Sequence, residues 1–447
     1  MRIRIFLILI IILAIAGGYS YYKGIIDFTK PEISFKEKPQ YIGAKKEIIF
    51  QVKDNNPGIK SVEVFILQNN KNIKILEDKN IPEGVNSKDY TVEIKARKLG
   101  LREGKAKLLF IAKDGSLLSN TQRLELDVEI DLTPPALSVL SSPASIMNGG
   151  TGFVFFRVSK DIEKTGIKVG ELEFNCFNGI FKNPSIYGCA FPYPYWWNKK
   201  KPIIVYAMDK AGNRASHSLI YFFKRKRYKR SIINLSDSFI ETKVKPLAEE
   251  DGFESDNPIE LFKYVNKTLR KKNEDFIHSI TKKVSINKPL FKGAFKQLKN
   301  SKMLGGFADY RKYKYKGKII KGADAYHKGM DFASIKNAPV QAANNGVVVY
   351  AGYLGIYGNT VIIEHGMGVF SIYSHLAEFK VKEGDRVSKE TIIGLTDTTG
   401  LAVGDHLHFG VIVQGVEVHP IEWLDKKWIK TRFEKEYNKI NELYGGK

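Results

Sequence analysis

The sequence predicts a mainly β protein whose last third is a glycine-rich, antiparallel β domain. Short runs of apolar residues bounded by Gly, Pro and Asn recur from about residue 31 to 224, and again from 291 to 425. Glycines punctuate the second stretch at short intervals, as expected where the chain turns often. Between the two stretches, residues 236–283 instead carry apolar residues at helical spacing.

The N-terminus has the pattern of an export signal. Arg2 and Arg4 precede an uncharged apolar run, Ile5–Tyr22. A basic flank followed by such a run is typical of a signal peptide or a signal anchor. Ala14-Ile-Ala16 resembles a cleavage site, yet the run is nearly long enough to span a bilayer. We expect residues 1–24 to be a single-pass anchor, with the positive flank in the cytoplasm and the bulk of the chain exported.

Composition suggests several domains and a polyanionic partner. The chain has 447 residues, 43% of them hydrophobic, and a formal net charge of +23. Such a charge favours nucleic acid, anionic lipid or an acidic cell-wall polymer, although a lysine-rich surface without a partner explains it equally well. The chain contains no nucleic-acid-binding motif, so we expect no nucleic-acid partner.

Two segments, 25–133 and 134–224, resemble copies of one unit. Each has proline before its first predicted strand, a strand that begins with Gly-Ile-Lys at Gly58 or Gly166, and a closing strand that ends in Ala-x-Asp at Asp114 or Asp209. Short alternating strands with turns between them predict β-sandwiches. The second copy resembles the immunoglobulin-like modules of exported bacterial proteins. We expect both copies to act as spacers or adhesion modules with envelope protein partners.

The chain has two cysteines, Cys176 and Cys189, both in the second predicted sandwich. In an exported chain they can pair and staple the intervening loop. Two reduced, buried cysteines are the alternative.

A helical connector is predicted over residues 225–290. It opens within the basic run Lys224–Arg230, which either contacts anionic lipid or wall polymer or is a solvated strand end or linker. Asp256 and Asn257 before Pro258 are a helix-start signal. We expect the connector to pack near the last domain, where it could cover the functional site. A C-terminal helix is predicted over 426–447.

The domain at 291–425 contains five residues suited to metal-dependent hydrolysis. Two histidines and a carboxylate can bind zinc and leave one coordination position open, and two further histidines can handle protons. Because residues i and i+2 share a face of a strand, two of these imidazoles can enter one site. The five residues are His327, Asp331, His375, His406 and His408.

The short motifs that contain these residues resemble those of the LytM/lysostaphin-type zinc endopeptidases, which cut peptide cross-links in bacterial peptidoglycan. The resemblance covers about a third of the chain, in the family's order and spacing. The Thr396–Gly400 turn departs from it, because Asp397 stands where the family often has glycine. The matching pieces are His327-x-Gly-x-Asp331, Pro339-Val-x-Ala-x-x-x-Gly346, Ile363-Glu-His365-Gly, Tyr373-Ser-His375-Leu, Gly384-x-x-Val387, Ile393-Gly394 and Gly404-x-His406-Leu-His408-Phe.

The resemblance implies a role for each residue. His327, Asp331 and His408 would bind one zinc ion, and His375 and His406 would be the catalytic pair. His365 would shape a turn. The implied function is cell-wall remodelling by a zinc-dependent peptidoglycan endopeptidase. We expect a bacterial envelope protein anchored in the inner membrane, with its catalytic domain in the periplasm or outside the membrane. The alternatives are a wall-binding regulator of another hydrolase and a zinc protease acting on proteins.

Overall fold

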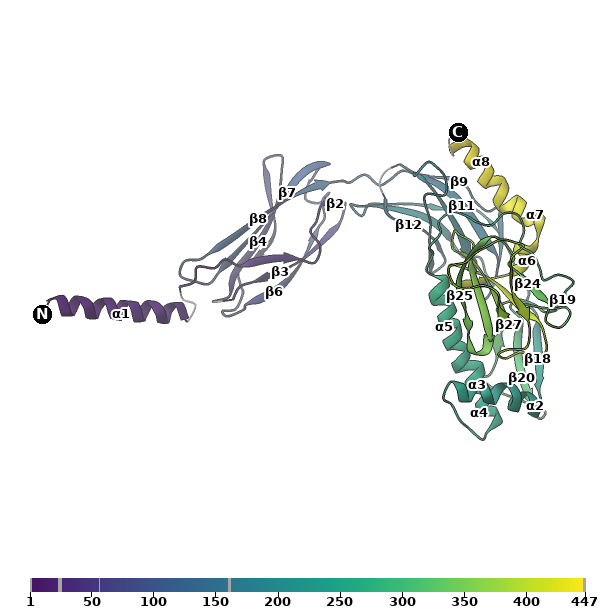
Figure 1. Cartoon of the computed structure of the whole chain (residues 1–447). Helices are drawn as coiled ribbons and strands as arrows, with labels where there is room; N and C mark the ends of the chain where they lie inside the picture. The colour runs from purple at the N-terminus through teal and green to yellow at the C-terminus, as the bar shows by residue number, and fades with distance from the viewer. Residues whose placement is uncertain (1, 23–25, 56, 160–161, 445–447) are drawn as a thin grey trace. The chain divides into compact units, whose positions relative to one another are not determined.

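The computed structural model describes residues 2–22, 26–55, 57–159 and 162–444. The chain divides into two compact units, and both are built mainly of strands, as predicted (Figure 1). The first unit comprises residues 1–136, 160–164 and 207–215, and the second comprises 137–159, 165–206 and 216–447.

The first unit begins with helix α1 (Arg2–Tyr22). Its apolar side chains from Ile5 to Leu13 are exposed, so the helix does not have the polar face and the buried apolar face of an amphipathic helix. Residues Ile5–Tyr22 are long and apolar enough to cross a membrane.

Eight strands follow in two sheets, in the orders β1-β3-β6 and β2-β8-β7-β4-β5. Alternate residues of β4 and β7 are buried, because successive side chains of a strand point to opposite faces. The rings of Phe50 and Phe110 meet edge to face at 5.1 Å in the core of this unit. The immunoglobulin-like assignment of this unit stays a prediction. The strands are β1 (Glu32–Phe35), β2 (Tyr41–Ile42), β3 (Lys46–Lys53), β4 (Ile59–Gln68), β5 (Lys71–Asp78), β6 (Ser87–Ile94), β7 (Gly104–Asp114) and β8 (Thr121–Ile130).

The next segment forms nine short strands in three small sheets, in the orders β14-β11-β9, β13-β12-β15-β16 and β10-β17. A disulfide joins Cys176 and Cys189, so the paired state is the one the structure shows. The strands are β9 (Leu137–Ser141), β10 (Ser145–Met147), β11 (Thr151–Val158), β12 (Ile162–Val169), β13 (Leu172–Asn175), β14 (Ile186–Pro192), β15 (Ile203–Asp209), β16 (Arg214–Ser218) and β17 (Phe222–Lys224).

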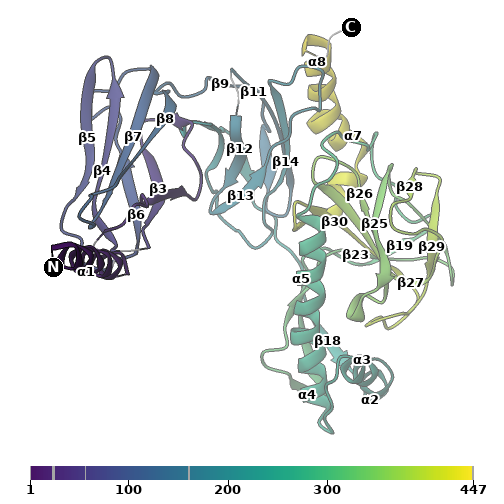
Figure 2. The same cartoon turned by 60° about the vertical axis from the view of Figure 1, so that its left-hand side comes forward.

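The connector begins as a strand and continues as helices. Strand β18 pairs in parallel with β20 of the following domain. Helix α4 begins at Pro258, where the Asn257 side chain accepts a hydrogen bond from the Ile259 amide, as predicted. Helix α5 lies beside the large sheet (Figures 1 and 2), and its Asn273 accepts a hydrogen bond from the Ile356 amide. The elements are β18 (Arg230–Leu235), β20 (Tyr310–Tyr315), α2 (Asp237–Phe239), η1 (Ile240–Val244), α3 (Lys245–Glu250), α4 (Pro258–Lys263), η2 (Tyr264–Leu269) and α5 (Arg270–Thr281).

The predicted glycine-rich domain is built on a ten-stranded sheet with the central order β19-β23-β30-β27-β26-β25-β28. Its strand pairs are antiparallel, as predicted. Strands β21 (Lys318–Ile319) and β22 (Ala325–Tyr326) pair with β20 instead. The ten strands are β19 (Lys302–Gly305), β23 (Met330–Ala333), β24 (Pro339–Gln341), β25 (Gly346–Tyr353), β26 (Asn359–Glu364), β27 (Val369–Phe379), β28 (Arg386–Val387), β29 (Ile392–Thr396), β30 (Leu407–Val413) and β31 (Val416–Val418).

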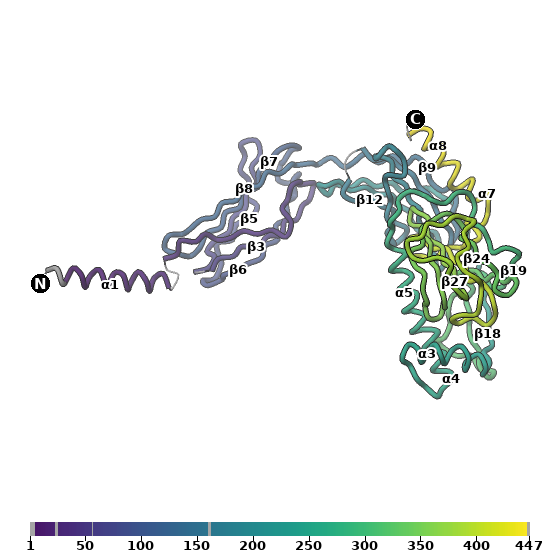
Figure 3. Tube along the Cα trace, in the orientation of Figure 1, coloured from purple at the N-terminus to yellow at the C-terminus, as the bar shows by residue number. Residues whose placement is uncertain are grey.

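The C-terminal helices join this sheet to the preceding strands in one apolar core. Helix α8 lies near β9 at the end of the chain (Figure 3), and the rings of Phe153 on β11 and Phe433 lie 4.9 Å apart. Trp423 is fully buried, and its indole nitrogen donates to Thr151 Oγ1 at 3.2 Å. Within the second unit, the strands after residue 136 and the domain after 290 therefore share their packing. The helices are α6 (Pro420–Leu424), α7 (Lys426–Ile429), η4 (Lys430–Glu434) and α8 (Lys435–Tyr444).

A partly buried carboxyl beside this core predicts a pH-dependent stability. Glu422 accepts a hydrogen bond from the Thr151 amide at 2.8 Å, and burial raises its pKa from 4.5 to about 8. At pH values between these two pKa values, Glu422 holds a proton in the folded chain and releases it in the unfolded chain, so stability falls as pH rises. We expect the second unit to lose on the order of 3 kcal/mol from about pH 6 to about pH 8.

Denaturant unfolding of the full chain at several pH values checks this expectation. Glu422→Gln should flatten the pH dependence over that range, because an amide does not titrate. Glu442→Gln, on the exposed side of α8, is the matched control and should leave the slope unchanged. An unchanged slope in Glu422→Gln would show that another group carries the dependence.

Candidate functional site

Adjacent strands bring the metal-binding candidates together. Asp331 on β23 stands directly opposite His408 on β30, so their side chains share a face of the sheet. His327 lies four residues before Asp331, in the short link that follows β22. His375 comes from β27, whose Ser374 also pairs with His408. His406 lies two residues before His408, at the entry to β30.

Three of these side chains converge on one point. His327 Nε2 lies 2.9 Å from Asp331 Oδ1 and 3.0 Å from His408 Nδ1, and the latter two atoms are 3.0 Å apart. Ligand atoms about 2.1 Å from a tetrahedral zinc ion lie roughly 3.4 Å from one another. The triangle is therefore close to the size a metal requires, and its donor set of two imidazoles and a carboxylate suits one.

Backbone groups and glycines hold this geometry. His327 Nδ1 donates to the Gly306 carbonyl at 2.8 Å, which leaves the Nε2 lone pair free for a metal. A side chain at residue 329 would place its Cβ 2.7 Å from His408 Nε2, and one at residue 305 would lie 2.3 Å from Asp331 Oδ2. Gly329 and Gly305 therefore allow the ligands to approach the backbone.

Electrostatics favour the forms that bind metals. Burial would raise the pKa of Asp331, but His327 and His408 outweigh it and hold that pKa well below its usual range. Burial lowers the pKa of His408 from 6.5 to about 4. An ionised carboxylate and a neutral imidazole are the states required of metal ligands.

The two remaining histidines lie beside this cluster. The rings of His375 and His406 are 4.8 Å apart, and His406 Nε2 is 3.7 Å from Asp331 Oδ1. His375 Nδ1 donates to the Thr399 carbonyl at 2.7 Å, so Nε2 is its free nitrogen. Burial, together with the neighbouring His406 and His408, lowers the pKa of His375 well below 6.5. Its backbone has φ +62°, a left-handed conformation that is rare for a non-glycine residue and often found at functional sites.

Asp397, which stands where the family often has glycine, lies between these histidines. The Asp397 amide donates to the His375 carbonyl at 2.8 Å, and its carbonyl accepts from the His406 amide at 3.3 Å. These contacts use only the backbone. The residue therefore links both histidines whatever side chain it carries.

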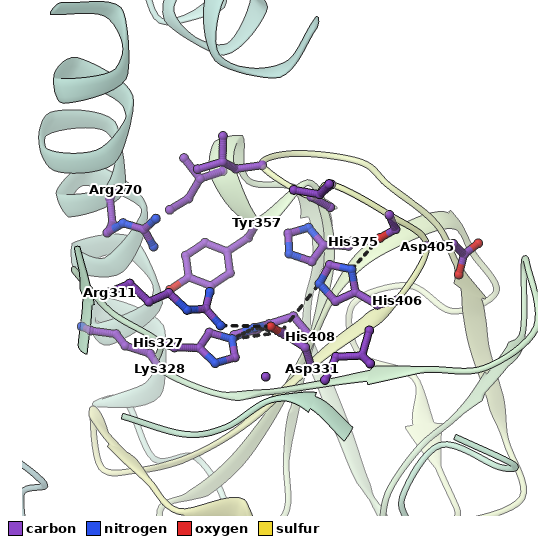
Figure 4. A pocket seen from close by; sticks show the side chains of 17 residues that line it. Arg270, Arg311, His327, Lys328, Asp331, Tyr357, His375, Asp405, His406 and His408 are labelled. Atoms are coloured by element: carbon purple, nitrogen blue, oxygen red, sulfur yellow. Dashed lines mark hydrogen bonds and ion pairs between the residues drawn. The ribbon is translucent and has the colours of Figure 1, made fainter. Parts of the chain in front are cut away.

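The five predicted residues line one cavity of about 430 Å³ (Figure 4). Three further residues lie with them that the sequence did not single out: Arg270, Arg311 and Tyr357. Arg311 Nη2 lies 3.4 Å from Asp331 Oδ2, so its positive charge supports the carboxylate. Arg270, at the start of α5, also lines the cavity, so the connector forms part of the cavity wall. Its guanidinium donates to Asn266 Oδ1 at 2.7 Å.

His365 lies apart from this cavity, in the core of the sheet. It is fully buried, donates from Nδ1 to the Asn345 carbonyl at 2.7 Å, and contacts Ser371 Oγ at 2.7 Å. Burial lowers its pKa to about 4, so it remains neutral. These contacts tie the turn after β26 to Asn345 and to strand β27, which is a structural role.

A buried charge cluster ties the connector to the site. Lys328, next to His327, places its Nζ 3.0 Å from Glu274 of α5 and 3.1 Å from Glu417 of β31. Glu417 also lies 2.8 Å from His278 Nε2. Burial would raise the pKa of Glu417, but Lys328 and His278 lower it to about 2.

Removing the lysine should destabilise the second unit. Lys328→Met leaves two partly buried carboxylates without their cation, and breaking a buried pair in this way costs about 3–5 kcal/mol. We expect about 3 kcal/mol in denaturant unfolding, because the lysine side chain is 16% exposed. Lys336→Met, on the exposed surface, is the control and should cost little. A loss below about 1 kcal/mol in Lys328→Met would show that the cluster adds nothing to stability.

Comparison with known proteins identifies the domain. Residues 325–420 match the family model described as Peptidase family M23. The chain carries a peptidase family M23 domain. The resemblance drawn from the sequence motifs is therefore confirmed, and all five predicted residues lie within the M23 match. The match and the three-residue cluster together imply a metal.

Named relatives share this domain. The DD-carboxypeptidase/endopeptidase Mpg of Neisseria meningitidis serogroup B is 39% identical over 95 residues, 21% of this chain and 22% of that protein. The peptidoglycan DD-endopeptidase ShyA of Vibrio cholerae is 40% identical over 98 residues, 22% of this chain and 23% of that protein. The matches thus cover less than a quarter of either relative's length.

One solved structure that is similar to part of this chain is the catalytic domain of the antimicrobial peptidase lysostaphin from Staphylococcus simulans. It is 29% identical and aligns with 30% of this chain and 98% of its own, with a TM-score of 0.26.

Proposed function

We propose that this protein is a zinc-dependent endopeptidase that hydrolyses peptide cross-links of bacterial peptidoglycan during cell-wall remodelling. The observation that carries the proposal is the cavity of the M23 domain, where three ligand atoms within about 3 Å of one another adjoin two further histidines. Relatives that share the domain are named as peptidoglycan endopeptidases.

In this proposal His327, Asp331 and His408 hold zinc, and an open fourth position suits a catalytic site. Zinc bound there supplies Lewis acidity toward the scissile carbonyl and makes hydroxide available near neutral pH. The chain's own residues tune this site. Arg311 and the Gly306 carbonyl fix the orientations of Asp331 and His327.

His375 and His406 move the protons in this proposal. His375 is held by the Thr399 carbonyl and His406 by the Gly404 carbonyl, each through Nδ1. Each therefore turns Nε2 toward the reacting groups, where it can accept a proton from the attacking water or donate to the oxyanion. Their low exposure reduces competition from bulk water.

We also propose that α1 anchors the chain in the inner membrane, with the M23 domain on the periplasmic or outer side. The apolar length of Ile5–Tyr22 and the basic residues before it support this placement. The first unit would then act as a spacer or as a contact for envelope proteins.

Metal analysis of the purified full chain tests the zinc assignment. One zinc per chain is expected, together with cleavage of a cross-linked stem-peptide dimer. A chelator should stop the cleavage, and zinc should restore it. A chain that folds and holds no zinc, or that cleaves equally in chelator, would refute the proposal. Zinc binding without cleavage would instead favour a regulator of another hydrolase, and cleavage confined to proteins would favour a zinc protease.

A further inference from the structure

Three aspartates from separate parts of the first unit meet in its interior. Asp27 lies between α1 and β1, Asp54 directly follows β3, and Asp114 ends β7. Each offers a carboxylate oxygen, and these oxygens all lie within 4.8 Å of one another. The three residues are 9%, 4% and 0% exposed, respectively. None of them belongs to the M23 domain.

Hydrogen bonds account for most of the carboxylate oxygens. Asp114 Oδ1 accepts from the Ser116 amide and hydroxyl and from the Asn120 amide, and its Oδ2 accepts from Asn120 Nδ2. Asp27 Oδ1 accepts from the Thr29 amide at 3.0 Å, and its Oδ2 accepts from the Thr29 hydroxyl at 2.6 Å. These neutral donors position the oxygens but leave the three negative charges uncompensated.

Asp54 is the exception. Its Oδ2 accepts from the Gly58 amide at 3.0 Å, but Oδ1 is buried and receives no hydrogen bond within the described part of the chain. Across those same described residues, no lysine or arginine forms an ion pair with any of the three aspartates. A buried carboxylate oxygen without a donor or a counter-charge is unfavourable unless a cation or a proton neutralises it.

We propose that Asp27, Asp54 and Asp114 form a calcium-binding site. The donor set is made of carboxylate oxygens without imidazole or thiolate, which selects a hard cation and not zinc. Calcium accepts the irregular arrangements that oxygens from three different loops provide, whereas magnesium requires a near-ideal octahedron. A divalent ion would offset most of the negative charge and complete the coordination of Asp54 Oδ1.

The site would fasten the segment after α1 to the sheets. Asp54 and Asp114 lie at strand ends, whereas Asp27 lies in the segment before β1. Asn120 Nδ2 already donates to the Asp27 carbonyl at 2.8 Å. Calcium would add ionic bonds from Asp27 to the ends of β3 and β7. Residues 26–31 would then be held more firmly when calcium is present.

Calcium titration of the full-length protein in detergent, by calorimetry, tests the proposal. The wild type should bind one Ca²⁺ at submillimolar to millimolar concentrations, in the range of extracellular calcium modules. Calcium should also slow chymotryptic cleavage after the exposed Phe28, next to Asp27, by at least about fivefold. No Ca²⁺ binding by the folded wild type, or an equal response to Mg²⁺, would overturn the assignment.

Variants locate the ion. Asp54→Asn and Asp114→Asn should each weaken calcium binding by at least about tenfold, since each removes a charged ligand. Asp127→Asn, an exposed position on β8, is the matched control and should bind as the wild type does. His408→Ala should lose zinc and keep calcium, which separates the two sites. Unchanged calcium affinity in folded Asp54→Asn would contradict the proposal.

Discussion

Replacing His408 with alanine is expected to abolish zinc binding and peptidoglycan cleavage together. His408 supplies one of three ligand atoms about 3 Å apart, and two protein ligands hold a metal poorly. The loss of affinity should exceed the roughly 10–100-fold that follows from removing a hydrogen bond that supports a ligand. Metal content after dialysis and the rate of peptide release measure both effects.

Two comparisons make this result specific. Asp331→Ala should behave in the same way, because it removes the carboxylate ligand. His217→Ala, an exposed histidine on β16, should keep both zinc and activity. Stoichiometric zinc in folded His408→Ala would refute its assignment as a ligand.

Replacing His375 should separate chemistry from metal binding. The ring nitrogen lies beside the ligand cluster but outside the triangle of ligand atoms, so zinc should stay bound. Loss of a general acid or base typically lowers the rate about 10²–10⁴-fold, and we expect kcat to fall within this range. Steady-state kinetics at equal zinc content provides the measurement.

The backbone of His375 calls for a second variant. At φ +62°, alanine adds strain, whereas asparagine tolerates this conformation and can still donate to the Thr399 carbonyl. His375→Asn should therefore fold as the wild type does and remain slow. A near-normal rate in His375→Asn with zinc bound would rule out proton transfer by this residue.

The site was predictable because its residues lie in short local patterns. The alternation of side chains along a strand placed His406 and His408 toward one cavity, and the structure confirms that both line it. The spacing of His327 and Asp331 was part of the family resemblance that the M23 match then confirmed. Their roles as ligands and catalysts remain proposals.

Other features depend on contacts between distant segments. Arg311 reaches the site because β20 pairs in parallel with β18, about 80 residues earlier in the chain, and no local motif marks that pairing. Arg270 enters from a helix whose sequence shows only its apolar face. The core that β11 shares with the C-terminal helices likewise arises from aromatic side chains, such as Phe153, that would fit any sandwich interior.

The most direct test of the account is digestion of intact peptidoglycan by the full-length protein, with products identified by mass spectrometry. The wild type should release soluble peptides with new amino and carboxyl ends at the cross-links, and these peptides should be absent with chelator or in His375→Asn. Zinc-loaded, folded protein that releases no peptide, or that releases the same peptides after the His375 substitution, would contradict it.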